Sequence, residues 1–288
     1  MFSKCLKYEL RAVWKIICIA SAALIGFSIV SSVTVRLLYN AAEKDPEGIV
    51  GGIASIVSVL MFFLAVITVS AYLLITAIVC IVRFYKHFFS DEGYLTFTLP
   101  VSRGTLYLAK AVNALIWDVA SVVSIVISLG IAAVILKPLA DMDTFEELVW
   151  VFGDIPSYRD LTEAFQRWLV PILLAFVLLL LACAVLSTGF TYFCVTAGSV
   201  LAKKHKILAA FGIFYGVNFV SSILGQFLPV AIEIAVMSIG DRLFSLGADR
   251  VLPLFFCVIL AVFGIVSAIA VTFHMISLGM IEKKLNLE

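Results

Sequence analysis

The sequence predicts an all-α membrane protein with six transmembrane helices and both ends of the chain in the cytoplasm. Three observations support this prediction: an apolar composition, six long apolar runs, and an uneven distribution of Lys and Arg. Of the 288 residues, 63% are hydrophobic and 14% are charged, against about 45–50% and about 25% in soluble domains. So little polar surface cannot cover a water-soluble globule. We therefore exclude a soluble enzyme, a disordered chain and a disulfide scaffold.

The apolar runs place the spans in order along the chain. The first run, residues 16–35, is expected to be a retained span, because no small-residue cleavage site of a signal peptide follows it. The second run, 49–82, is longer than a membrane requires, so we place the span at 58–82 and treat 49–57 as an outer extension. The remaining spans are expected at 111–136, at 169–202, from 207 onward with a break near Pro229, and at 251–280.

The charges between the spans orient the chain. Thirteen of the 20 Lys and Arg residues lie on the side that holds both termini, and seven lie on the other side. The positive-inside rule therefore places both termini in the cytoplasm. The net charge of +1 gives no reason to expect a nucleic-acid partner.

The outer loop 137–168 carries seven acids and three bases, and we expect two short helices there on the outer rim.

Several signatures of chemistry are missing from the sequence. It contains no phosphate-binding GxxxxGK[ST] loop, no HExxH helix and no GxSxG turn. None of the six cysteines lies in an outer loop, and the three histidines are far apart, so we expect neither a disulfide framework nor a metal site. We expect no enzyme activity and no cofactor bound by this chain. Energy for any driven process would come from another chain or from an ion gradient.

The N-terminal segment, residues 1–15, is predicted to form an amphipathic helix along the inner membrane surface. At helical spacing, one side gathers four cations and the other gathers apolar residues: Lys4, Lys7, Arg11 and Lys15 against Phe2, Cys5, Leu6, Leu10 and Val13. The alternative is a basic flank that only orients the first span. Glu9 points into the apolar side, so we expect it to meet a basic or hydrogen-bonding group on a neighbouring inner loop or on a partner subunit.

The cytoplasmic segment 83–110, between the second and third spans, is the most informative stretch. Ser90 is a candidate N-cap, with Asp91 and Glu92 in the first turn of a short helix. Gly93 permits an unusual backbone, Pro100 ends the element, and Ser102 can cap the helix that follows. The apolar side chains in this water-facing loop are Tyr94, Leu95, Phe97 and Leu99. Either they form a docking element for a partner or they pack back onto the ends of the spans.

The stretch FFSDEGYLTFTLPVS, from Phe88 to Ser102, resembles the transmembrane permease subunits of bacterial ABC-type exporters, and KYEL at 7–10 is similar too. The resemblance implies one permease domain over 1–288 in the bacterial plasma membrane, with six spans that form half of a dimeric pathway. It also implies an interface helix at the N-terminus and a coupling helix after the second span, both in contact with a separate ATPase that uses ATP. The residues implied to form the coupling element are Phe88, Phe89, Ser90, Asp91, Glu92, Gly93, Tyr94, Phe97, Leu99 and Pro100.

Two acidic residues lie within apolar runs. Asp118 is about eight residues into the third run, and Glu233 follows Pro229 in the fifth. Acids inside a membrane normally face the helix bundle or a wet cavity, which makes both functional candidates. For Asp118 the alternative is a structural hydrogen bond with Asn113 or a nearby serine. For Glu233 we expect an outer interfacial position.

These features favour one function and leave two others open. We expect a permease subunit that forms a dimer with a second copy or a paralogue, sits among membrane lipids, and binds an ABC-type ATP-binding subunit. Export of a peptide, lipid or amphiphile is favoured because the spans carry few polar groups. The alternatives are a self-contained gradient-driven transporter that uses Asp118, and a membrane sensor or scaffold that transports nothing.

Overall fold

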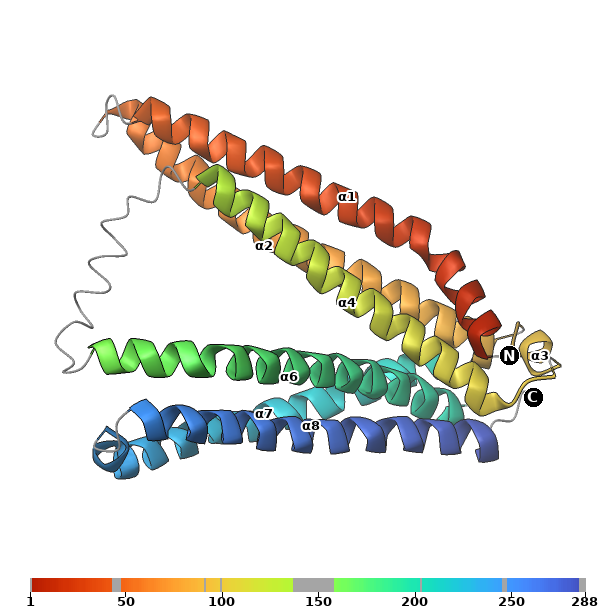
Figure 1. The fold of residues 1–288 in the computed structure, drawn as a ribbon. Coiled ribbons are helices and arrows are strands. Elements are labelled where there is room, and N and C mark those ends of the chain that lie inside the picture. The colour runs from red at the N-terminus through yellow and green to blue at the C-terminus, as the bar shows by residue number, and fades with distance from the viewer. Residues whose placement is uncertain are drawn as a thin grey trace. The chain divides into compact units, whose positions relative to one another are not determined.

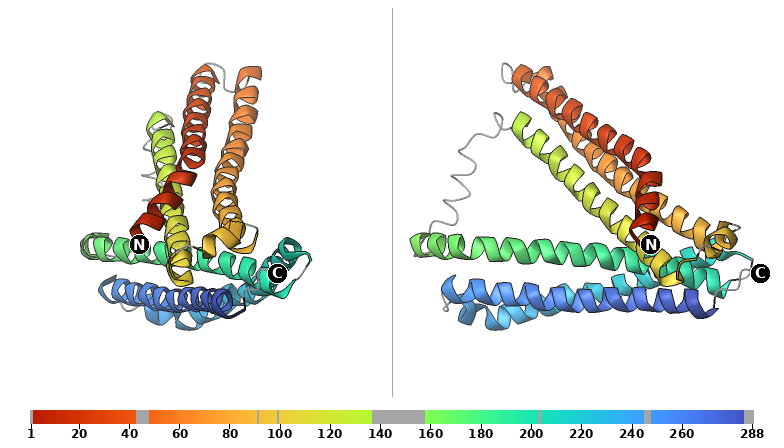
Figure 2. Two further views of the ribbon diagram at one scale, coloured as in Figure 1. Left: turned by 90° about the vertical axis from the view of Figure 1, so that its right-hand side faces the viewer. Right: turned by 45° about the vertical axis from the view of Figure 1, so that its right-hand side comes forward.

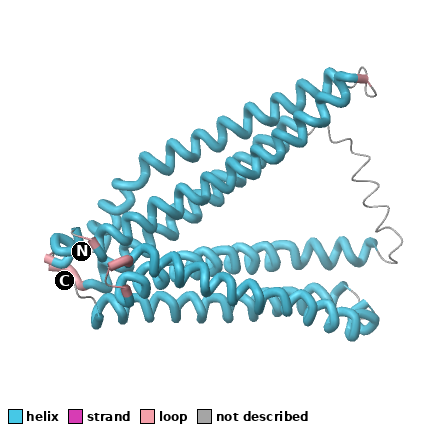
Figure 3. Tube along the Cα trace, turned by 180° about the vertical axis from the view of Figure 1, so that it is seen from behind, coloured by secondary structure: helices cyan, strands magenta, loops and turns pink. Residues whose placement is uncertain are grey.

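The computed structural model describes residues 2–42, 48–90, 92–98, 100–136, 158–202, 204–244 and 248–284. Within those ranges, the side chains at 158–166, 224–225, 228–244, 248–251 and 284 are outside the description. The described elements are all helices, and no strand occurs among them (Figures 1 and 3). They are α1 (Phe2–Ala42), α2 (Ile49–Phe89), α3 (Glu92–Phe97), α4 (Arg103–Leu136), α6 (Tyr158–Leu201), α7 (Lys206–Phe244) and α8 (Ala248–Lys284).

Six of these helices are long and apolar enough to cross a membrane, which confirms the all-α, multi-pass prediction. Only α3 is too short to span. The apolar faces of the long helices remain exposed within the chain, as expected where lipid rather than water is the surrounding solvent. The side of the membrane on which each end lies stays a prediction.

Helix α1 combines the N-terminal helix and the first span, which the sequence analysis predicts as two separate elements. The amphipathic N-terminal segment and the first span form one continuous helix, Phe2–Ala42, which changes direction near its N-terminal end (Figure 2). The four predicted cations of this segment are all exposed, whereas Val13 is buried and Leu10 half-buried. Phe2, on the predicted apolar side, is 38% exposed, and the position of this segment along the inner membrane surface stays a prediction.

Two expectations about helix boundaries differ from the structure. The fifth run does not break at Pro229, because α7 continues from Lys206 to Phe244. Proline is tolerated inside transmembrane helices, where neighbouring groups take over the backbone hydrogen bond that it removes. Pro171 in α6 and Pro253 in α8 also lie inside continuous helices. The second helix expected in loop 137–168 is the start of α6, at Tyr158, and the first falls outside the described residues.

The chain forms two compact units, residues 1–82 with 112–154, and residues 83–111 with 155–288. In the first unit, α1, α2 and α4 meet through hydroxyl groups. Ser21 Oγ lies 2.9 Å from Tyr72 Oη, and Ser28 Oγ donates to the Ser128 carbonyl at 2.9 Å. Because Ser21 donates its own proton to the Ile17 carbonyl, the Tyr72 hydroxyl is the donor to Ser21. We call these contacts the hydroxyl seam.

In the second unit, α6 packs against both α7 and α8. The contact between α6 and α7 depends on Gly198. A Cβ atom at this position would lie 2.4 Å from the backbone nitrogen of Ala210, far inside contact distance. The absence of a side chain therefore allows the two backbones to approach closely, as small residues do at helix interfaces in membranes.

Candidate partner-docking site

The short helix α3 lies between the end of α2 and the start of α4, both of which belong to the second unit at this point. The expectation that Ser90 caps α3 is wrong. Its hydroxyl donates instead to the Lys86 carbonyl at 2.7 Å and so closes the last turn of α2. The Ser90 carbonyl accepts from the Gly93 N–H at 2.8 Å, which ties α3 tightly to α2. Ser102 caps α4 as predicted, since its Oγ accepts from the Thr105 N–H.

The two apolar faces of α3 point in different directions. Phe97 packs inward, with its ring 5.7 Å from the Phe88 ring in an edge-on arrangement. Tyr94 and Leu95 point outward and are 56% and 73% exposed. The two sequence-based alternatives thus apply to different residues: Phe97 anchors the helix, and Tyr94 and Leu95 form an exposed apolar surface. We call Glu92, Tyr94 and Leu95 the α3 surface.

Arg103, the first residue of α4, fastens α3 to the last turn of α8. Its guanidinium carbon lies 5.0 Å from the centre of the Phe97 ring, within cation–π range. Its Nη1 donates to the carbonyl oxygens of Ile281 and Glu282, both at 3.2 Å. Carbonyls in the last turn of a helix have no partner within the helix and carry its negative end, so a cation is favourable there. The C-terminal end of α8 therefore lies beside the connection from α3 to α4.

A buried cation is linked through a histidine to the α3 surface. Lys110 is 4% exposed, and its Nζ lies 2.9 Å from His87 Nδ1. An ammonium group can only donate, so Nδ1 is the acceptor and the other ring nitrogen, Nε2, carries a proton. That nitrogen lies 3.6 Å from a carboxylate oxygen of Glu92. The arrangement holds Glu92, the first residue of α3, in an electrostatic contact with α2.

Beneath these groups lies a cluster of aromatic rings from α2, α4 and α6. The rings of Phe84 and Tyr192 are stacked, with centroids 3.9 Å apart and planes at 4°. Tyr107 meets both rings edge-on, at 6.0 Å and 6.1 Å. Phe84 and Phe88 are fully buried. Edge-on ring pairs are a favoured geometry, and the cluster contacts α3 through the edge-on pair of Phe88 and Phe97.

His274 on α8 completes this cluster. Its Nε2 donates to the Val185 carbonyl at 3.2 Å, which leaves Nδ1 to accept from the Tyr107 hydroxyl at 2.8 Å. Gly189 makes room for the imidazole, because a Cβ there would lie 2.9 Å from two atoms of the His274 ring. Both ring nitrogens of His274 are thus hydrogen-bonded, one to Tyr107 on α4 and the other to Val185 on α6.

The remaining predicted residues of the coupling element have mixed positions. Phe89 and Gly93 are buried, and Pro100 is exposed in the connection between α3 and α4. Asp91 and Leu99 lie outside the described residues. Their expected contact with an ATPase stays a prediction, as it does for every residue of the set.

The other three candidates do not join this site. Glu9 is half-buried on α1, in the first unit, and its contact with a partner subunit or an inner loop stays a prediction. Asp118 is half-buried on α4, also in the first unit. Glu233 lies within α7, but its side chain is outside the description. Asn113 accepts a hydrogen bond from Trp117 Nε1 at 3.2 Å.

Sequence reasoning missed the residues that hold α3 in place. Arg103, Lys110, Tyr107, Tyr192 and His274 come from three helices that are far apart in the sequence. A partial signal was available: Phe84 and Phe88 are four residues apart on one helix face, which marks a ring-lined surface without naming what covers it.

The described residues contain no group of three or more His, Cys, Asp or Glu side chains that could hold a metal ion. Comparison of the chain with protein-family models, with curated proteins and with solved structures finds no match.

Proposed function

We propose that this chain is the membrane-spanning permease subunit of an ATP-driven ABC-type transporter. A separate ATP-binding subunit would dock on the α3 surface, and a second copy or a paralogue would complete the pathway. The chain itself would hydrolyse no ATP. Export of a peptide, lipid or amphiphilic compound fits best, because the apolar stretches of the six long helices carry few charged groups.

One observation carries the proposal. The polar connection between two predicted spans presents Tyr94 and Leu95 outward, on a helix too short to be stable alone. Exposed apolar side chains on a cytoplasmic loop mark a contact surface rather than a solvated turn. Movement of a partner on this surface would pass directly to the helices that hold α3, because Phe97, Arg103 and His87 connect it to α2, α4 and α8.

The α3 surface can be tested by purifying the tagged full chain from gently solubilised membranes. Proteins that come with it are identified by mass spectrometry, and ATP hydrolysis by the complex is measured. We expect a soluble ATPase with the unchanged chain and its loss from the variant Leu95→Glu. Leu95 is 73% exposed and makes none of the contacts that hold α3, so the folded chain should be unaffected.

Leu201→Glu is the matched control, because Leu201, at the end of α6, is 74% exposed and Leu95 is 73% exposed. This variant should keep the ATPase. The absence of an ATPase from every sample would contradict the proposed function. An ATPase that binds both variants alike would place its contact elsewhere.

Transport assays in vesicles separate the three functions considered. ATP-dependent movement of a hydrophobic reporter supports the permease. Movement driven by an ion gradient and lost in Asp118→Asn would support a self-contained transporter instead. An ATPase complex without transport under either condition would support a sensor or scaffold.

A further inference from the structure

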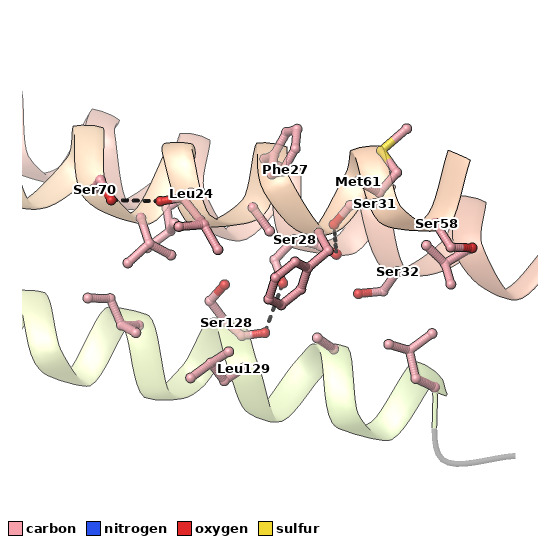
Figure 4. Close-up of a pocket in the computed structure, with 18 residues that line it drawn as sticks. Leu24, Phe27, Ser28, Ser31, Ser32, Ser58, Met61, Ser70, Ser128 and Leu129 are labelled. Carbon is pink, nitrogen blue, oxygen red and sulfur yellow. Dashed lines mark hydrogen bonds between the residues drawn. The ribbon is translucent and has the colours of Figure 1, made fainter. Parts of the chain in front are cut away.

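The hydroxyl seam opens into a cavity in the first unit, between α1, α2 and α4 (Figure 4). The cavity has a volume of about 490 Å³, within the range of sites that hold drug-sized ligands. Six of its 18 lining residues are serines, the other 12 are apolar, and none of the 18 is charged. It lies along the C-terminal parts of α1 and α4 and the N-terminal half of α2.

Two of the six serines have hydroxyl groups that are not used by the protein. Ser32 and Ser128 are 4% and 5% exposed, and neither hydroxyl makes a hydrogen bond within the described part of the chain. Both side chains point into the space between the helices (Figure 4). A hydroxyl that faces an apolar cavity without a protein partner has its hydrogen-bonding capacity free for a ligand, since a membrane offers no bulk water to take it up.

The other serines of the cavity behave differently. Ser28 donates to the Ser128 carbonyl and Ser31 donates to the Ser28 carbonyl. Ser58 and Ser70 donate to carbonyls of their own helix, Ala54 and Val66, both at 2.8 Å. Such bonds are the usual way in which serine is accommodated inside a membrane helix. Ser32 and Ser128 are therefore the two lining serines with free hydrogen-bonding capacity.

The cavity is open at the apolar surface of the chain. Phe62, Val66 and Leu129 line it and are also at least half exposed. A molecule could thus enter sideways from the bilayer without crossing a polar region. The lining sets the chemistry of that molecule: an apolar body for the aliphatic and aromatic walls, and no net charge, since no lining residue could pair with one.

We propose that this cavity is a binding site for an uncharged amphiphile from the bilayer. The ligand has an apolar body and a hydroxyl, ester or amide oxygen that is hydrogen-bonded by Ser32 and Ser128. The inference stands on the cavity itself, and binding is measured without ATP or an ATPase. It can therefore fail while the proposed transport function holds, and the reverse is equally possible.

The test uses photolabelling of the purified full chain in lipid nanodiscs. Three alkyne-tagged diazirine probes share one long alkyl chain: an alcohol, a hydrocarbon without the hydroxyl, and a carboxylate. Peptide mapping locates the labelled residues. We expect the alcohol to label α1 and α4 around the cavity most strongly, and unlabelled long-chain alcohol to compete with it. Equal labelling by the alcohol and the hydrocarbon would overturn the assignment, and so would preferential labelling by the carboxylate.

Variants then test the two serines. Ser32→Ala with Ser128→Ala should weaken alcohol binding about ten-fold, as expected for the loss of two hydrogen bonds, and should leave hydrocarbon labelling unchanged. Ser58→Ala with Ser70→Ala is the matched control, because those hydroxyls are already bonded within α2. If both pairs have the same effect, the proposal is wrong.

A third variant tests the cavity volume. Ala65→Phe places a ring in the cavity and should reduce labelling by all three probes. Ser128→Met serves the same purpose if Ala65→Phe does not give a monodisperse protein. Unchanged labelling in a well-folded filling variant would show that the probes bind elsewhere.

Discussion

The helices of the two compact units contact one another through different kinds of side chain. In the first unit, α1, α2 and α4 meet through small hydroxyl-bearing side chains, which bond across the helices and leave a cavity. In the second, α2, α4, α6 and α8 meet through stacked and edge-on rings with a glycine at a close contact. Small polar groups thus leave room for a ligand, whereas large rings fill the volume and fix the position of an exposed helix.

The difference has a physical basis in the membrane setting. Burying apolar surface between helices gains little when lipid is just as apolar, so packing and hydrogen bonds decide where helices associate. Aromatic rings make many van der Waals contacts in favourable geometries. Hydroxyl pairs make few such contacts, and their hydrogen bonds are directional. We expect the ring cluster to be the more stable of the two contacts and the hydroxyl seam to be the more adaptable.

The largest expected effect comes from removing a central ring. Phe84→Ala removes the stack with Tyr192 and the edge contact with Tyr107. It should lower the free energy of unfolding by about 3–5 kcal/mol, because a fully buried ring leaves a cavity. The measurement is reversible unfolding in mixed micelles. Phe219→Ala, at an exposed phenylalanine on α7, is the control, and equal losses in the two variants would contradict the central role of the ring cluster.

An intermediate effect should distinguish close packing from open packing. Gly198→Ala places a methyl group against the Ala210 backbone and should destabilise the protein by about 1–3 kcal/mol. Gly130→Ala, on α4 in the first unit, meets nothing within 4 Å and should be neutral or slightly stabilising. Thermal unfolding of both purified variants provides the comparison. A destabilising Gly130→Ala would argue against open packing in the first unit.

The smallest expected effect concerns a further hydroxyl bond between helices of the first unit, which we add to the hydroxyl seam. Ser121 is fully buried on α4, and its Oγ donates to Thr76 Oγ1 on α2 at 3.3 Å. Ser121→Ala should cost about 0.6 kcal/mol, the typical value for a side-chain hydrogen bond between helices in a membrane. Ser70→Ala, whose bond stays within one helix, should change less. A loss as large as that of Phe84→Ala would mean that the seam, rather than the ring cluster, holds its helices together.

The sequence was sufficient for the class of protein and for most of the elements. Apolar runs and charge-free stretches predicted six spans, and the polar segment 83–110 predicted a short helix before Pro100. These properties are local: hydropathy and turn chemistry act over a few residues. The sequence misplaced a break at Pro229 because a proline inside a lipid-facing helix gives the same local signal as a proline that ends one.

Only the tertiary structure decided which faces meet. Phe97 packs inward, whereas Tyr94 and Leu95 are exposed. The Ser90 hydroxyl donates its hydrogen bond to α2 and does not cap α3. The bond between Tyr107 and His274 joins residues 167 apart in sequence. Periodicity shows that a helix has a face, but not what covers it. The ring cluster that holds α3 and the cavity along the hydroxyl seam both arise from contacts between helices, which no single stretch of the sequence encodes.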